Sequence, residues 1–368
     1  MGPAPGRFSP LPFAMRPSRL SSAALALVAG LLIALAGCDA TAPSADGSAD
    51  LKKTPARLDP VVVVADRGSG TISVIDVGTD EVVDTITLPG ANTPEPMYVV
   101  YSRRLNRVFV GDRANDEVVA YDARDFALVG TAPATGIFHM WADENRSTQL
   151  WVVDNVNNRL TVLDPAALSV ITTIPIADGV PHDVIVDASG RTAFVTVFVE
   201  GGADLVLQFD TGSFEETGRV EVGEDPHLSL TRRNDLLYVP NQGTNEVLVF
   251  DRETLEPVEA LDVPGAHGAG MAPDGRTFYT TNLPGGGTDG LVAIDTRTHA
   301  VLGATDTPVA VPHNVAATNG NRKLYVTHSG PTANQVTVYS ASGGSPVPAY
   351  ETTVTVGTNP FGLAYVPR

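Results

Sequence analysis

Short apolar runs, each followed by polar turn residues, recur along the chain from residue 61 to its end. Val, Ile, Thr and Tyr dominate the runs, and Gly, Asn, Asp and Pro separate them at short intervals, which is typical of β-strands joined by turns. No segment shows a sustained helical period. One run of this kind recurs in seven places: residues 61–66, 107–112, 149–154, 192–197, 236–241, 277–282 and 323–328.

Three further strands are predicted around each of these runs. The next strand of each unit ends in an aspartate that we expect to form an Asx turn, in all units but the last. These aspartates are Asp76, Asp122, Asp164, Asp210, Asp251 and Asp295. A third strand follows, such as 82–88, and a fourth opens the next unit and ends in a turn.

Four strands per unit and seven units predict an all-β fold, a seven-bladed β-propeller formed by residues 60–368. The chain enters this pattern on a second strand, residues 61–66, and ends on a first strand, residues 360–366. We therefore expect one-plus-three strand closure of the terminal blade, which would join the two ends and leave no open sheet edge.

The N-terminal segment is typical of an export signal. Residues 1–37 contain no acidic residue, and Arg16 and Arg19 precede an apolar run from Ala23 to Ala36 that is too short to span a membrane. Small residues before Cys38, the only cysteine, resemble a bacterial lipobox, which implies a signal peptide over residues 1–37 and lipidation of Cys38. The start could be Met1 or Met15.

Residues 38–59 are rich in Ala, Ser, Thr and Pro and are predicted to be a flexible tether. The sequence thus predicts an exported, monomeric domain held on the periplasmic or outer side of a bacterial membrane.

The formal net charge is −18, and it becomes −21 without residues 1–37, which hold three arginines. No cluster of basic residues is present, so nucleic-acid binding is not expected.

Five of the seven histidines open the fourth strand of successive units, at steps of 43, 45, 40 and 46 residues. If the units form a ring, one position of the repeat faces one region of space. The histidines at this position are His139, His182, His227, His267 and His313. The corresponding positions of the other two units hold Met97 and Phe361, and His328 ends a neighbouring strand. We read His299 as an exposed surface residue.

The runs LYVPN, FYTTN and KLYVTH, each followed by a turn and a strand, resemble the YVTN-repeat (YncE-like) propeller family. Residues 71–88 and 181–191 are also similar to that family's repeat. The resemblance covers residues 60–368 and implies the propeller fold. It is less informative on function, since the family includes surface-layer and periplasmic proteins and related propellers include lactonases, lyases and metal-dependent oxidases.

The favoured hypothesis is a transition-metal site at the mouth of the central channel, because neutral imidazole binds Zn, Cu or Fe and a Met97 thioether would favour copper. Such a site could also be catalytic. The candidate ligands are His139, His182, His227, His267, His313, His328 and Met97. Asp183, Asn314 and Asp225 lie beside these histidines in the sequence and are predicted to orient them. The hypothesis requires three imidazole nitrogens within ~4 Å of one point.

Two alternatives remain open from the sequence. The first is a metal-free module whose polar face binds a protein, a glycan or another component of the cell envelope. The second is a lactonase-like hydrolase in which the same histidines act as acid–base groups without a metal. Long loops at 198–204 and 283–290, predicted on the histidine face, could carry specificity for a small molecule or a protein.

Overall fold

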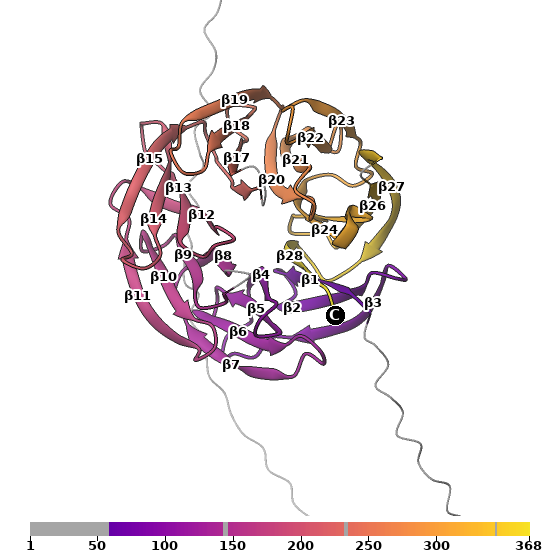
Figure 1. The fold of residues 1–368 in the computed structure, drawn as a ribbon. Helices are drawn as coiled ribbons and strands as arrows, with labels where there is room; N and C mark the ends of the chain where they lie inside the picture. Colours follow the sequence, from indigo (N-terminus) through magenta and orange to yellow (C-terminus); the bar gives the residue numbers. More distant parts are fainter. Residues whose placement is uncertain (1–58, 143–145, 232–234, 343) are drawn as a thin grey trace, which may run out of the picture. The chain divides into compact units, whose positions relative to one another are not determined.

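The computed structural model describes residues 59–142, 146–231, 235–342 and 344–368. These residues form seven four-stranded antiparallel sheets arranged as the blades of a ring (Figure 1). The predicted all-β, seven-bladed propeller is therefore confirmed. The predicted signal peptide, the tether and Cys38 lie outside the described residues.

Each blade has an innermost strand near the ring axis and three strands that follow outward. The innermost strands are β28 (Pro360–Val366), β4 (Pro96–Ser102), β8 (Ile137–Ala142), β12 (Val180–Val186), β16 (Ser229–Leu230), β20 (Ala266–Met271) and β24 (Pro312–Ala317). The second strands are β1 (Val61–Asp66), β5 (Arg107–Asp112), β9 (Leu150–Asp154), β13 (Thr192–Phe198), β17 (Leu236–Asn241), β21 (Thr277–Asn282) and β25 (Lys323–His328).

The outer half of each blade is built in the same order. The third strands are β2 (Thr71–Asp76), β6 (Glu117–Asp122), β10 (Arg159–Asp164), β14 (Asp204–Asp210), β18 (Glu246–Asp251), β22 (Leu291–Asp295) and β26 (Gln335–Ser342). The outermost strands are β3 (Glu81–Thr87), β7 (Leu128–Pro133), β11 (Ser169–Pro175), β15 (Glu216–Val222), β19 (Pro257–Asp262), β23 (Val301–Thr305) and β27 (Ser345–Thr355). Two 3₁₀ turns complete the described elements, η1 (Leu283–Gly285) and η2 (Asn319–Asn321).

We number the blades from blade 1, which contains β28 and β1–β3, to blade 7, which contains β24–β27. In blade 1 the last strand pairs antiparallel with the first, through Val61 opposite Val366 and Val64 opposite Leu363. The first sheet thus takes strands from both ends of the described chain. This pairing covers an edge that β1 would otherwise leave without partners.

The burial of the strands explains the hydrophobic pattern of the sequence. Strand β1 is buried at every residue, whereas β3 is exposed or half-buried throughout. The second and third strands of a blade have a neighbouring blade against both faces, so their apolar runs are nearly continuous. The predicted Asx turns form at the ends of the third strands, where, for example, the Asp164 carboxylate accepts hydrogen bonds from two backbone N–H groups.

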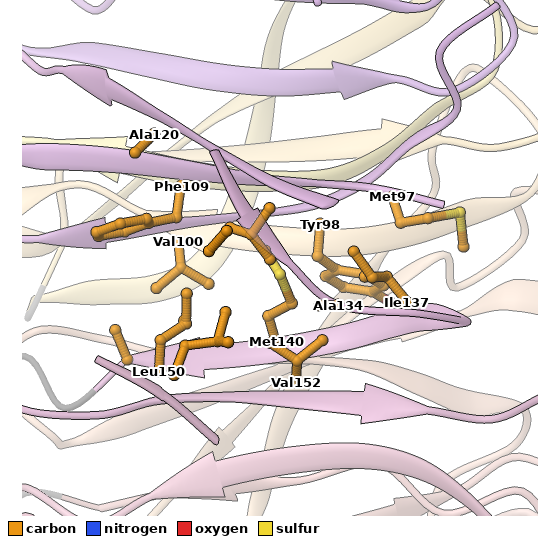
Figure 2. Close-up of a cluster of buried hydrophobic side chains, with 14 of the residues drawn as sticks. Met97, Tyr98, Val100, Phe109, Ala120, Ala134, Ile137, Met140, Leu150 and Val152 are labelled. Atoms are coloured by element: carbon orange, nitrogen blue, oxygen red, sulfur yellow. The ribbon is translucent and has the colours of Figure 1, made fainter. Parts of the chain in front are cut away.

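The hydrophobic core lies between adjacent blades. Figure 2 shows the cluster between blades 2 and 3, in which Phe109 and Val100 of blade 2 face Met140 and Leu150 of blade 3. Such a buried Phe costs about 3–5 kcal/mol of stability when it is replaced by Ala. None of the described segments forms a helix of the length and apolarity needed to cross a membrane.

Candidate metal centre

The innermost strands begin with a bulge that aims side chains at the ring axis. In blade 4, Pro181 pairs with Val197 and Val184 pairs with Val195, so two residues, His182 and Asp183, stand opposite one. An extra residue of this kind turns its side chain out of the regular alternation. The same shift occurs in every blade except blade 5, where the strand is regular and His227 directly follows Pro226.

The pairing corrects the predicted position of His139. In blade 3 the shift runs from Ile137 to Met140, so Phe138 occupies the place that His182 occupies in blade 4. His139 lies one residue later, at the place of Asp183. The sequence repeat aligned histidine with histidine, and only the strand register reveals the offset. The side chains at the first position are Met97, Phe138, His182, His227, His267, His313 and Phe361.

The five histidines of the predicted set nevertheless lie together. Ring centroids are 5.1 Å apart for His139 and His182, 4.7 Å for His182 and His227, and 4.0 Å for His227 and His267. His313 follows at 4.9 Å from His267. All five are buried, with at most 8% of the surface of each exposed. The cluster therefore closes one end of the channel, rather than lining an open mouth as the sequence suggested.

Asp183 orients two of these rings. Its carboxylate accepts a hydrogen bond from His139 Nδ1 at 2.7 Å and lies 3.7 Å from His227 Nδ1. The backbone N–H groups of Val184 and Leu228 also donate to it. Burial opposes its ionisation, but the two histidines outweigh that effect and hold the pKa of Asp183 well below its usual range. The predicted orienting role fits this geometry, since Asp183 contacts both rings through Nδ1 and leaves His227 Nε2 to contact His182.

The inward-facing nitrogens have few protein partners. His182 Nε2 and His227 Nε2 are 3.3 Å apart, and His139 Nε2 is buried without a hydrogen-bond partner among the described residues. Both ring nitrogens of His267 are also buried without a partner in that part of the chain. Burial first, and then neighbouring imidazoles, lower the pKa of His182 and His267. Neutral rings with unshared lone pairs are what a metal ion requires.

Asp225 completes the arrangement. One of its carboxylate oxygens lies 3.9 Å from both His182 Nε2 and His227 Nε2, and the other lies 4.0 Å from His267 Nδ1. A triangle with sides of 3.3, 3.9 and 3.9 Å has a centre about 2.2 Å from each corner. Metal–nitrogen bonds of 2.0–2.1 Å and metal–oxygen bonds of 2.0–2.2 Å match that radius. Asp225 is thus placed as a potential ligand and not only as an orienting group.

Two further groups of potential ligands share residues with this triangle: His139, His182 and His227, and Asp225, His227 and His267. The donor atoms of each group lie within 4.8 Å of one another. Three atoms that are at most 4.8 Å apart all lie within about 2.8 Å of one common point, because such a triangle fits inside a circle of radius 4.8 Å divided by √3. The requirement of three nitrogens within ~4 Å of one point is therefore met.

His328 does not join the cluster. Its Nδ1–H donates to the Ala310 carbonyl at 3.0 Å, and its Nε2 accepts from the Thr337 hydroxyl at 2.7 Å, so both nitrogens are used inside blade 7. Burial lowers the pKa of His328 to about 4. Met97 is completely buried in the hydrophobic cluster of Figure 2.

Two further expectations have mixed outcomes. His299 is half-buried, and its Nδ1 is 2.9 Å from the Tyr238 hydroxyl, so the reading as an exposed surface residue was wrong. The Asn314 side chain contacts His313 Nδ1 at 2.7 Å and donates to the Phe361 carbonyl, as an orienting group would.

Two aromatic contacts of the cluster were not predicted from the sequence. Tyr98 lies against His139 with ring centroids 3.8 Å apart, and Phe198 lies against His182 at 4.3 Å. Tyr98 directly follows Met97, so the repeat would have located it once the second bulge position was recognised. Phe198 opens the long 198–204 loop, which the sequence had placed on the histidine face.

A cavity of about 370 Å³ begins beneath the cluster and follows the ring axis. Its closed end is formed by Tyr98, His139, Asp183, His227 and Asn314. Its walls are the remaining residues of the innermost strands, and it ends among the turns that connect these strands to the second strands. The centre therefore adjoins a space large enough for a small molecule.

Solved structures with the same fold come from proteins of low sequence identity. A gluconolactonase of the Pseudomonas aeruginosa periplasm, PpgL, is 19% identical, with a TM-score of 0.67 over 83% of this chain and 99% of that one. Hydrazine synthase of Kuenenia stuttgartiensis is 15% identical, with a TM-score of 0.61 over 77% of this chain and 98% of that one. At these identities the similarity establishes the propeller fold alone. No protein-family model matches the sequence, and no curated protein matches it significantly, so the YVTN-repeat assignment stays a resemblance.

Proposed function

We propose that this propeller binds one transition-metal ion at the closed end of its channel and uses it to bind or transform a small molecule. The observation that carries the proposal is the triangle of His182 Nε2, His227 Nε2 and the Asp225 carboxylate, whose centre lies about 2.2 Å from all three atoms. Two imidazoles and a carboxylate favour zinc or iron over softer metals. Met97 and His328 are not in the proposed set, because one is packed in the core and the other has both nitrogens engaged.

The surrounding residues would prepare the centre. Asp183 fixes the tautomer of His139 by accepting from Nδ1, and it also faces His227 Nδ1. His139 lines the closed end of the cavity, and its Nε2 has no hydrogen-bond partner among the described residues, so it can accept or deliver a proton there. A bound metal ion would supply Lewis acidity and would lower the pKa of a coordinated water.

Metal analysis tests this proposal directly. The full chain, purified without chelators and then titrated with Zn²⁺ or Fe²⁺, should take up about one ion per chain. The double variant His182→Ala/His227→Ala should take up none, while His299→Ala, which alters a histidine of blade 6 bonded to Tyr238, should bind as the wild type does. An unmodified protein that binds no transition metal stoichiometrically, or a double variant that binds as well as the wild type, would refute it.

A metal-independent hydrolase acting on lactones is the second candidate, and one observation favours it. The His139–Asp183 pair, joined at 2.7 Å and adjacent to the cavity, has the geometry of a general base that activates water. A structural neighbour is a gluconolactonase. A panel of lactones assayed with and without chelator separates the candidates. Hydrolysis that survives the chelator and is lost in His139→Ala would favour this second function.

We also propose that the protein is exported and anchored through lipid on Cys38, as the sequence of residues 1–38 suggests. Expression in a bacterial host with a labelled fatty acid tests this. The wild type should carry label and appear in the membrane fraction, whereas Cys38→Ala should carry none. Label on the variant, or none on the wild type, would contradict the anchor.

A further inference from the structure

The cavity reaches the histidine cluster from the opposite end of the channel. Its lining residues run from Tyr98, His139 and Asp183 at the closed end to Arg103 and Ala188 in turns at the other end. Arg103 and Ala188 are exposed, whereas each histidine of the cluster is at most 8% exposed. The histidine end is thus sealed by its own side chains, and the opposite end meets solvent.

The walls between these ends carry more apolar than polar surface. Ile185, Ala269, Met271, Ala316 and Leu363 all line the cavity. Four aromatic side chains line it as well: Tyr98, Tyr101, Trp141 and Tyr365. Aromatic walls give flat contact surfaces for a planar ligand.

The charged residues of the wall are already engaged or lie at the rim. Asp183 is held by His139, and Asp187 accepts hydrogen bonds from the Ser189 hydroxyl and the Arg191 backbone. Among the described lining residues, Arg103 is the one arginine, no lysine occurs, and Arg103 is exposed at the rim. Unless a bound metal ion takes part, a charged ligand deep in the channel would therefore lose its hydration without gaining a partner of opposite charge from the walls.

Beside Ser229 and Asn319, the walls offer few polar partners for a sugar-like molecule. Asn314 is engaged with His313 and the Phe361 carbonyl, and the Thr231 hydroxyl bonds to its own chain at Leu236. A polyhydroxylated ligand needs a partner for each buried hydroxyl group, because an unpaired one costs about 1–3 kcal/mol. The lining therefore disfavours sugars and favours carbon-rich molecules.

We infer that the ligand of this propeller enters through the channel end opposite the histidine cluster. The ligand is a neutral, predominantly apolar molecule with an aromatic or similarly flat body. The part of this inference that brings the ligand to a metal ion rests on the proposed function. The route and the chemical class rest on the walls alone, so the two are separable by experiment.

Calorimetric titration of the full chain with 1-naphthol, a neutral aromatic alcohol, tests the chemical class, with myo-inositol as the polyhydroxylated counterpart. We expect saturable binding of 1-naphthol and at least about tenfold weaker binding of myo-inositol, which corresponds to about 1.4 kcal/mol. Equal binding of both, or no binding of 1-naphthol, would overturn the class.

Two narrowing variants test the route. Ala316 and Ala269 are half-buried residues of the channel wall on neighbouring blades. Ala316→Phe and, independently, Ala269→Phe should weaken 1-naphthol binding at least tenfold. The control Val180→Phe introduces the same side chain two residues before His182, at the histidine end, where Val180 is 36% exposed. It should leave binding unchanged. The route would be overturned if folded Ala316→Phe and Ala269→Phe bound 1-naphthol like the wild type while Val180→Phe lost binding. That result would place the entrance at the histidine end.

Metal titration of the same proteins keeps the two proposals apart. If the wild type binds 1-naphthol as expected but no metal, the proposed function fails and the channel inference stands. If it binds metal but the narrowing variants bind 1-naphthol like the wild type, the channel inference fails and the proposed function stands.

Discussion

Blades 3 to 6 and blades 7 and 1 place side chains at the same end of the channel, yet carboxylates lie beside only the first group. On the first side, Asp183 joins His139 to His227, and Asp225 faces His182, His227 and His267. On the second side, His313 lies 4.2 Å from Phe361 and contacts the neutral amide of Asn314. A repeated histidine thus becomes a candidate ligand only where a neighbouring blade supplies an anion.

The largest difference in metal affinity should appear between two variants that each lack one histidine, one from either side. We expect His227→Ala to lower metal affinity by more than about 100-fold, because it removes a direct donor and also the partner of Asp183. His313→Ala should change the affinity by less than about threefold, since the Asp183 and Asp225 contacts described do not involve it. Competition titrations against a chromophoric chelator measure both values. Equal losses in the two variants would erase the distinction between the sides.

The next effect concerns the orienting carboxylate. Asp183→Asn keeps the shape but removes the charge that fixes His139 and faces His227, and we expect a 10- to 100-fold loss of metal affinity. Asn314→Ala, its counterpart at the same position in blade 7, should leave affinity within about threefold, because an amide adds no charge. The same competition titration applies. An unaffected Asp183→Asn protein would mean that the carboxylate serves the fold alone.

Acid should weaken the fold through the histidine that lies outside the cluster. Unfolded histidine takes up a proton near pH 6.5, whereas the pKa of folded His328 is about 4. Between these values the unfolded chain binds more protons, so the free energy of unfolding falls as pH drops from 6.5 towards 4. The share of His328 is at most about 3 kcal/mol, at 1.36 kcal/mol for each pKa unit.

Urea unfolding at pH 7 and pH 5 measures this loss. His328→Asn introduces the residue found at the same strand position in blades 5 and 6, Asn241 and Asn282. The variant should lose less stability than the wild type on acidification. A pH dependence identical in both proteins would assign the acid sensitivity to the cluster.

The smallest effect should follow from adding a histidine to the uncharged side. Phe361→His places a sixth imidazole beside His313 at the first bulge position of blade 1. We expect metal affinity to stay within about twofold and stability to fall by about 1 kcal/mol, as for an ordinary loss of packing. A clear gain in metal affinity would show that imidazoles alone build the site.

The sequence predicted much of the fold because a propeller is a local and repeated structure. Each unit contained four strands with recognisable turns, and the seven units implied a ring. The site was less predictable. Spacing correctly grouped five histidines, but it set His139 at the wrong bulge position, because a one-residue offset leaves the hydrophobic pattern of a short strand almost unchanged.

His328 shows the other limit of the sequence. Its place at the end of β25 suggested that it faces the other histidines, yet Thr337 and the Ala310 carbonyl satisfy both of its nitrogens. Which hydrogen bonds a side chain makes depends on residues from other strands, and no spacing rule contains them. The distance of Asp225 from His182 was equally out of reach of the sequence, since the two residues come from neighbouring blades.

The sequence by itself determined the strands, the number of blades and the grouping of the histidines, because these follow from hydrophobic periodicity and from a repeat of roughly fixed length. Only the tertiary structure decided which imidazoles face a carboxylate and that the cluster seals its end of the channel. Those outcomes depend on distances of a few ångströms between side chains of different blades. Close packing around the axis sets such distances, and it involves residues 40 or more positions apart in the sequence.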